Sequence, residues 1–297
     1  MIESWVLYAL GATAIQTVRF MLQKVVATRD LSAGGATFAR FLYSGPIVWV
    51  VALLILPELP ALGSLFWIYA LVGGVSQILA TLCTVMIFQS RNFAVGITLK
   101  KTEVLLTVLI GIVILGEGVS WPGFAAMVLG VVGVLLLSDP PKIEGQGLKG
   151  LLLSRAVVLG LTSGIFFGIS AVTYRGATLE VAAEPATRAL VALAFVLLVQ
   201  VVAMAVWLGL REPGQITRVA LAWRRCIWIG LTSLGGSYCW FNAFTLENAG
   251  YAFAVGQLEV IFSLAASVYF FHETVTRREI FGIALIFLSV VALIAVT

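Results

Sequence analysis

The sequence Leu99-Lys100-Lys101-Thr102-Glu103 is followed without a break by an apolar run from Val104 to Leu115. These two lysines and one glutamate lie in a segment with the length and hydrophobicity of a membrane-spanning helix. Each charge near the centre of such a helix costs about 2.5–3.5 kcal/mol of insertion free energy if it faces lipid. The charges are therefore expected to face a bundle interior or a water-filled cavity, where partners are available. The sequence predicts a charged cavity inside a membrane protein.

The composition supports this prediction. The chain has 297 residues, of which 61% are hydrophobic and 11% are charged, and its mean hydropathy is +1.08. Soluble domains average about 25% charged residues, so we predict an all-α integral membrane protein with no separate soluble domain. The net charge of +4 is spread along the chain and does not favour nucleic acid as a partner. The three cysteines have no CxxC spacing, so we predict no metal site and no cofactor.

The apolar runs predict ten membrane-spanning helices of roughly 20 residues each. A polar, proline- and glycine-containing segment near mid-chain, residues 139–150, is interpreted as a linker between halves 1–138 and 151–297. The ten predicted spans are 4–25, 34–56, 65–88, 93–115, 120–138, 152–174, 186–209, 225–246, 250–271 and 279–296.

The two halves repeat the same pattern. Glu117 follows Glu103 by 14 residues and ends the fourth apolar run. Glu259 and Glu273 repeat that spacing 156 positions later, and Glu273 ends the ninth run. The same offset relates Phe88 to Phe244, Cys83 to Cys239 and Asn92 to Asn248. Five spans per half is an odd number, so the second half would enter the membrane in the opposite orientation, which predicts an inverted repeat around a central cavity.

This pattern resembles the EamA-like branch of the drug/metabolite transporter superfamily, in which each five-helix repeat closes with an acidic residue before a glycine-rich last span. The corresponding residues are Gly116-Glu117 before 120–138 and His272-Glu273 before 279–296. The resemblance covers essentially the whole chain and implies a ten-helix carrier that moves metabolites, amino acids or drugs without ATP. The chain departs from the family at Lys100-Lys101, where small apolar residues are usual, so the substrate class cannot be taken from the resemblance. It also has His272 where the pattern has glycine.

The positive-inside rule predicts the orientation. Arg175 and Arg188 are the basic residues of one set of connectors, and both have glutamates near them. This distribution places both termini on the periplasmic side of a bacterial inner membrane, whereas members of the resembled family more often have the opposite arrangement. Residues 218–225 mix basic and apolar side chains with a tryptophan and fit a position along the cytoplasmic interface. The connectors of the predicted cytoplasmic side carry Lys24, Arg29, Arg91, Lys142, Lys149, Arg155, Arg211, Arg218, Arg224, Arg225, Arg277 and Arg278.

The candidate substrate site centres on the charged stretch. Lys100 and Glu103 are three residues apart and share a helix face. Lys101 is rotated by about 100° from Lys100, so it lines a different wall or pairs with another helix. In the second half, Glu259 corresponds to Glu103 and Gln257 to Lys101. We predict a cavity with two related carboxylates and a surplus of positive charge; the alternative is that these charges only fix helix packing.

Further polar side chains are expected to join this site. Gln16, Gln77, Trp240 and Asn242 are difficult to explain by helix packing alone, and amides beside an aromatic wall suit a polar organic substrate. Glu259 has no basic neighbour within a helical turn, so it is the candidate for a proton-carrying carboxylate. Four other charges are assigned to the span ends.

Arg40 and Arg188 begin the second span of each half. They are expected to extend to the membrane interface as anchors; the alternative is that they gate the cavity or attract an anionic group. Glu117 and Glu273 are interpreted as caps of the helices that follow them.

These observations favour a secondary transporter that moves a small polar metabolite by alternating access, either amino-acid-like or carrying a carboxylate or phosphate, with proton-coupled export as an option. The chain lacks the GxxxxGK[ST] loop of ATP-driven pumps. A polyspecific drug or cation exporter is the alternative and would be expected to have an acidic cavity without lysines. A channel or a membrane-embedded enzyme is less favoured, the latter because the chain has one histidine and no HExxH sequence. The expected partners are the substrate, the lipid bilayer and H⁺; monomer and homodimer both remain open.

Overall fold

The computed structural model describes residues 3–88, 99–137, 155–271 and 276–297. The predicted all-α architecture is confirmed for these residues, none of which forms a strand. Six of the described helices are long and apolar enough to cross a membrane, namely α1 (Ser4–Arg29), α2 (Ala33–Ile55), α3 (Phe66–Phe88), α8 (Arg155–Leu179), α9 (Pro185–Arg211) and α14 (Arg277–Val296). The remaining helices are α5 (Glu103–Leu115), α6 (Trp121–Leu137), α10 (Gln215–Leu221), α11 (Trp223–Leu246), α12 (Ala249–Val255) and α13 (Leu258–Phe271). The number of ten spans stays a prediction.

The sequence explains where several helices begin and end. The Ser32 hydroxyl accepts a hydrogen bond from the Gly35 amide at 2.9 Å and caps the start of α2. Thr276 and Glu279 form a capping box at the start of α14. The helix α5 ends at Gly116, whose φ of 69° lies in the left-handed region that favours glycine. The end of α5 therefore explains why the Gly-Glu motif has a glycine at position 116.

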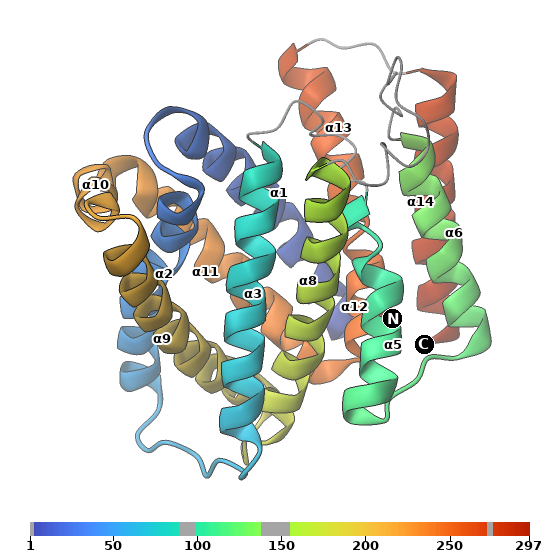
Figure 1. The fold of residues 1–297 in the computed structure, drawn as a ribbon. Helices are drawn as coiled ribbons and strands as arrows, with labels where there is room; N and C mark the ends of the chain where they lie inside the picture. The colour runs from blue at the N-terminus through green and yellow to red at the C-terminus, as the bar shows by residue number, and fades with distance from the viewer. Residues whose placement is uncertain (1–2, 89–98, 138–154, 272–275) are drawn as a thin grey trace.

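The long helices pack in reciprocal pairs (Figure 1). The first helix of the chain, α1, packs on α11, and α8 packs on α3 in the same way. The helices α2 and α9 form a further pair, as do α6 and α14 at one side of the bundle. In that last pair the Ser289 hydroxyl donates to the Ala126 carbonyl at 2.6 Å, and Gly133 lies close to Gly282, which fixes an antiparallel crossing. Small residues at these contacts allow the close approach that membrane helices use.

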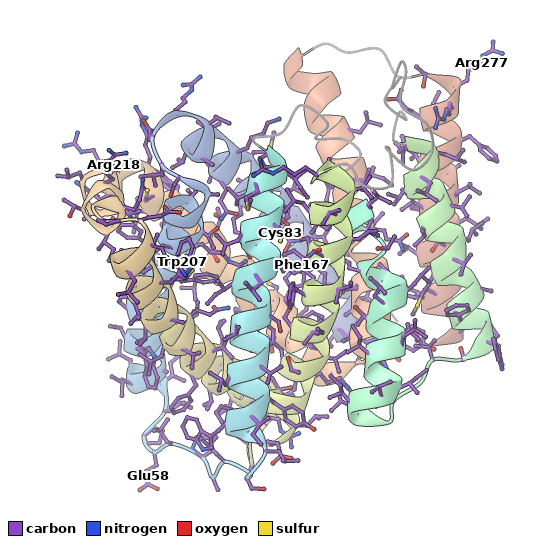
Figure 2. All side chains as sticks on the ribbon, in the orientation of Figure 1. Glu58, Cys83, Phe167, Trp207, Arg218 and Arg277 are labelled. Carbon is purple, nitrogen blue, oxygen red and sulfur yellow. The ribbon has the colours of Figure 1, made fainter. Side chains whose placement is uncertain are left out.

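The outer surface of the bundle is apolar, while charges gather at its ends. Leu54 and Val113 are among many large aliphatic side chains that are exposed on helix surfaces, as expected for a surface that contacts lipid. Figure 2 shows Arg218 and Arg277 at one end of the bundle and Glu58 at the opposite end. The structure therefore has the surface of a multi-pass membrane protein.

Two predicted spans differ from the structure. The span predicted at 250–271 is two helices, α12 and α13, separated by a turn at Gly256 and Gln257. The span predicted at 93–115 is described from Leu99 onward and is interrupted at Lys101, with α5 starting at Glu103. The predictions for Asn92, the linker 139–150, and the second-half motif His272-Glu273 lie outside the described residues.

The close packing of α3 against α8 gives a first testable prediction. A methyl group added at Gly73 would lie 2.6 Å from Thr173 Oγ1 and 2.7 Å from the Tyr174 ring. We expect Gly73→Ala to lower the free energy of unfolding by about 1–3 kcal/mol, because the buried neighbours must move. The matched control is Gly209→Ala in α9, where no atom lies within 4 Å. Thermal unfolding in detergent compares the two; equal stability of both variants would contradict this description of the contact.

Candidate functional site

Two helix interruptions stand at corresponding positions of the two halves. Lys101 and Thr102 form a turn before α5, and Gly256 and Gln257 form a turn before α13. The amide of Val104 donates to the Lys101 carbonyl at 3.5 Å. The amide of Val260, 156 positions later, donates to the Gln257 carbonyl at 3.1 Å. Each half-helix thus starts next to a glutamate, and its first-turn amides carry partial positive charge.

The interruptions bring four buried charges together. The side chains of Lys100, Lys101, Glu103 and Glu259 belong to residues that are only 1–6% exposed. Lys101 Nζ lies 2.6 Å from Glu259 Oε2 and 3.9 Å from Glu103 Oε1. Lys100 Nζ lies 3.6 Å from Glu103 Oε1. The alternative prediction that Lys101 pairs with another helix is therefore confirmed, and its partner comes from the second half of the chain.

This pairing corrects one sequence argument. Glu259 was assigned a proton-carrying role because no basic residue lies within a helical turn of it in the sequence. In the fold, Lys101 reaches it from the first half, and the Gln16 amide donates to the same oxygen at 3.1 Å. The argument failed because it considered only the helix on which Glu259 lies.

Gln16 organises one side of the site. Its carbonyl oxygen accepts hydrogen bonds from Trp240 Nε1 at 3.1 Å and from Arg19 Nη2 at 3.4 Å. Because its amide nitrogen is committed to Glu259, the orientation of the Gln16 side chain is fixed on both sides. Gln16 and Trp240, both predicted site residues, are thus brought together with the charged cluster.

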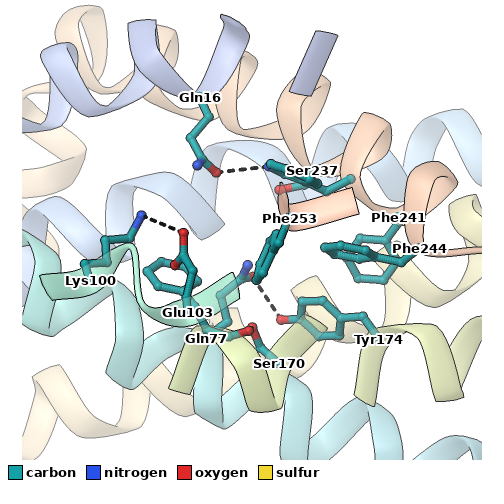
Figure 3. A pocket seen from close by; sticks show the side chains of 12 residues that line it. Gln16, Gln77, Lys100, Glu103, Ser170, Tyr174, Ser237, Phe241, Phe244 and Phe253 are labelled. Atoms are coloured by element: carbon teal, nitrogen blue, oxygen red, sulfur yellow. Dashed lines mark hydrogen bonds and ion pairs between the residues drawn. The ribbon is translucent and has the colours of Figure 1, made fainter. Parts of the chain in front are cut away.

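A narrow central cavity of about 20 Å³ lies beside this cluster (Figure 3). Lys100 and Glu103 stand at one side of it, and the rings of Tyr174, Phe241 and Phe244 stand at the other. Tyr174 and Phe241 are stacked with ring centroids 4.5 Å apart. The helices α1, α3, α8, α11 and α12 and the start of α5 contribute the lining, which comprises Gln16, Gln77, Lys100, Glu103, Phe167, Ser170, Tyr174, Ser237, Trp240, Phe241, Phe244 and Phe253.

Gln77 lines this cavity and is hydrogen-bonded to Tyr174 of its aromatic wall. Its side-chain oxygen accepts hydrogen bonds from the Tyr174 hydroxyl at 2.9 Å and from Gln200 Nε2 at 3.1 Å. Gln200 in α9 was not singled out in the sequence, because a glutamine within a long apolar run gives little local indication of its partner.

Two predicted site residues lie outside the cavity lining. Asn242 is buried, and its side-chain amide donates to the Tyr238 carbonyl one turn earlier at 2.8 Å. Gln257 is fully buried against α6, where a methyl group added at Gly130 would clash with its side-chain oxygen. Neither polar atom of the Gln257 amide has a hydrogen-bond partner among the described residues. The predicted substrate contacts of these two side chains therefore have no support in the cavity geometry.

The position of Arg40 differs most clearly from its prediction. The expectation that it extends to the membrane interface is wrong, because Arg40 is 3% exposed and enclosed by α3 and α11. Its guanidinium group donates to the hydroxyls of Ser233 at 2.8 Å, Thr81 at 3.0 Å and Ser237 at 3.3 Å. No described carboxylate lies within 4 Å of it. Ser237 also lines the cavity, so its hydroxyl lies between the Arg40 guanidinium group and the cavity.

Arg19 is a buried cation that sequence reasoning missed. It lies inside α1, donates to Gln23 Oε1 at 2.7 Å and stacks over the Phe20 ring at 4.2 Å. A signal was present, since Gln16, Arg19 and Gln23 are spaced three and four residues apart on one helix face. Among the described residues, the bundle interior thus holds four cations, Arg19, Arg40, Lys100 and Lys101, and two carboxylates, Glu103 and Glu259.

Glu117 differs from its prediction as a helix cap. Its carboxylate pairs with Arg175 Nε of α8 at 2.6 Å. The same arginine donates to the carbonyls of Phe244 and Glu247 at 2.7 Å each. Arg175 therefore joins the end of α5 to the end of α11 at one end of the bundle. Arg188 lies at the start of α9 and donates to the Ala183 carbonyl at 2.6 Å, as suits a residue at a span end.

The comparisons with known proteins agree on the family and the fold. The sequence model of the EamA-like transporter family matches residues 3–139 and again residues 154–295. No curated protein matches the chain. One solved structure, described only as a crystal structure of a protein, superposes with a TM-score of 0.71 at 16% identity and covers 99% of this chain and 97% of its own. Within the described residues, no group of three or more His, Cys, Asp or Glu side chains could hold a metal ion.

Proposed function

The chain belongs to the EamA-like transporter family, a family of membrane transporters in the drug/metabolite transporter superfamily, and we propose that it moves a small anionic metabolite through the central cavity. The substrate would be amino-acid-like or carry a carboxylate or phosphate group. Transport would proceed without ATP, by alternating access between the two halves of the chain. The ten predicted spans, arranged as two inverted repeats, are part of this proposal, and the reciprocal pairing of α1 with α11 and α8 with α3 supports them.

The surplus of buried positive charge carries the proposal. Four buried cations face two buried carboxylates, so two positive charges lack a described counter-ion. Burying a charge without a partner costs roughly several kcal/mol of desolvation free energy. Such a charge in a membrane protein is usually retained because it has a function. A bound anion would supply the missing negative charge. A cationic substrate would add to the surplus, which disfavours the alternative of a cation exporter.

The cavity suggests how such a substrate would lie. Lys100 Nζ is held 4.6 Å from the Phe167 ring centroid and 4.9 Å from that of Phe20, and its carboxylate partner Glu103 is 3.6 Å away. This looser pairing leaves Lys100 available to the anionic group of a substrate. The aromatic rings across the cavity would contact the apolar part of the same molecule.

Alternating access requires contacts that join the two halves and can be broken. At the centre, Lys101 of the first half pairs with Glu259 of the second. At one end, Glu117 of the first half pairs with Arg175 of the second. We propose that an anion bound at Lys100 weakens the attraction of Lys101 for the glutamates and so eases the relative movement of the halves.

The membrane orientation remains part of the proposal. Both termini would lie on the periplasmic side of a bacterial inner membrane, with the end that carries Arg218 and Arg277 in the cytoplasm (Figure 2). Proton coupling through Glu259 is not included, because the close Lys101 partner removes the reason for assigning it.

Uptake into liposomes tests the proposed substrate class. The full chain would be reconstituted and offered amino acids, dicarboxylates and sugar phosphates, with ethidium and tetraphenylphosphonium as cationic probes. We expect saturable uptake of at least one anionic probe and a reduction of its kcat/KM by roughly 10- to 100-fold in Lys100→Gln, the effect of losing one charge-assisted hydrogen bond.

The matched control is Arg188→Gln, which removes a positive charge at a span end away from the cavity. This variant is expected to transport at the wild-type rate. Preferred uptake of the cationic probes would overturn the anionic assignment, and equal transport by Lys100→Gln and wild type would remove Lys100 from the site.

A further inference from the structure

A second hollow lies at the end of the bundle where α1 ends, α10 passes and α11 begins. Its volume is about 740 Å³, and it shares no lining residue with the central cavity. Its lining is basic and partly apolar, and consists of Arg29, Asp30, Leu31, Arg218, Leu221, Ala222, Trp223, Arg224 and Arg225.

The short helix α10 is held firmly beside this hollow. Val219 is fully buried, and its carbonyl accepts a hydrogen bond from the Tyr43 hydroxyl of α2 at 3.1 Å. At the start of α10, Gln215 accepts from the Ser32 amide at 3.5 Å, and Glu212 just before it accepts from the Ser32 hydroxyl. The basic side chains of the hollow therefore project from a fixed framework, which reduces the ordering cost of binding a ligand there.

The charges of the hollow are only partly balanced. Arg225 pairs with Asp30, the sole acidic residue of the lining. For Arg29, Arg218 and Arg224, no described carboxylate lies within 4 Å. The lining thus carries a net charge of +3, four arginines against one aspartate.

Exposed apolar side chains accompany these arginines. Leu221, the last residue of α10, is 79% exposed, and Trp223, the first residue of α11, is 53% exposed. The Arg224 guanidinium lies 5.6 Å from the Trp223 ring centroid. Tryptophan at such a position is typical of the membrane–water interface, and clustered arginines beside it attract anionic headgroups.

We propose that this hollow binds the phosphate headgroup of an anionic phospholipid, with the acyl chains alongside Leu221 and Trp223. The arginines supply the charge that a phosphate requires, and the apolar side chains supply the contact that a lipid offers and a free phosphate does not. The proposal is independent of the transported substrate, since no residue of the hollow lines the central cavity.

Native mass spectrometry of the full chain in detergent tests the proposal. The protein would be mixed with equal amounts of phosphatidylglycerol and phosphatidylcholine with identical acyl chains. We expect wild type to retain phosphatidylglycerol selectively and Arg218→Gln/Arg224→Gln to bind it about 25-fold more weakly, since each arginine near the surface contributes roughly fivefold. The single variant Arg224→Gln is expected to lose about fivefold.

The matched control is Arg155→Gln/Arg277→Gln, which removes two exposed charges from the starts of α8 and α14, outside the hollow. This control is expected to retain phosphatidylglycerol like wild type. Excess inorganic phosphate is expected to leave the lipid bound. The proposal is overturned if the two lipids are retained equally, if the control loses the lipid as strongly as the test variant, or if inorganic phosphate at equal concentration displaces it.

Discussion

Replacing Lys101 with methionine is expected to lower the free energy of unfolding by about 3–5 kcal/mol. The lysine lies 2.6 Å from Glu259, and both residues are nearly fully buried. Without Lys101, the Glu259 carboxylate would remain in the bundle with the Gln16 amide as its described hydrogen-bond donor. An uncompensated charge in a low-dielectric interior is far less stable than either the ion pair or a neutral pair.

The double variant Lys101→Met/Glu259→Gln separates this cause from a loss of packing. Removing both charges is expected to restore the free energy of unfolding to within about 1 kcal/mol of wild type, because no unpaired carboxylate is left. Chemical unfolding in detergent micelles measures all three proteins. Lys100→Met is the matched comparison, with an expected loss of about 1–2 kcal/mol, since that lysine has a looser carboxylate partner and two aromatic rings. If the double variant is as unstable as Lys101→Met, the ion pair is not what stabilises this contact.

The sequence identified the charged cluster because hydrophobic segments tolerate few charges. Lys100, Lys101 and Glu103 interrupt an apolar run, and Glu259 repeats the pattern 156 positions later. This reasoning needs only the cost of placing charge in lipid. It also led to the family, since the repeated spacing extends over both halves of the chain.

The helix interruptions were not predictable in the same way. The ninth run contains no proline, and a single Gly256 does not require a break. The turns at Lys101 and Gln257 involve contacts between distant parts of the chain, such as the one from Lys101 to Glu259. Unwound backbone is tolerated within a bundle where protein surrounds it, and local sequence does not reveal that enclosure.

Arg40 illustrates the same limit. It lies seven residues into α2, about 10 Å from the helix start, a distance that a long side chain can bridge to the interface. The structure instead surrounds it with Thr81 of α3 and Ser233 of α11. Hydroxyl residues are common in membrane helices for packing reasons, so their role as arginine partners appears only in three dimensions.

This environment predicts the largest effect on transport. We expect Arg40→Gln to lower the kcat/KM for the transported anion by about 100-fold, because a positive charge about 6 Å from an anion contributes roughly 2.8 kcal/mol at an effective dielectric constant of 20. The Ser237 hydroxyl accepts a hydrogen bond from Arg40 and lines the cavity. It would either bridge Arg40 to the bound anion or turn aside so that Arg40 contacts the anion directly. Liposome uptake of the best anionic probe measures the loss.

The free energy of unfolding decides whether Arg40 acts on the substrate or only on the fold. Arg40 is a buried cation with hydroxyl partners and no described carboxylate, so removing its charge relieves a desolvation cost. Arg40→Gln is therefore expected to be at least as stable as wild type while losing transport, and Arg40→Lys is expected to keep part of the transport because it keeps the charge. A parallel loss of stability and transport would assign Arg40 to helix packing, and wild-type transport by Arg40→Gln would remove it from the anion site. Loss of transport without loss of stability is what an anion-binding role requires, because the charge stabilises the bound substrate and is unfavourable in the empty protein.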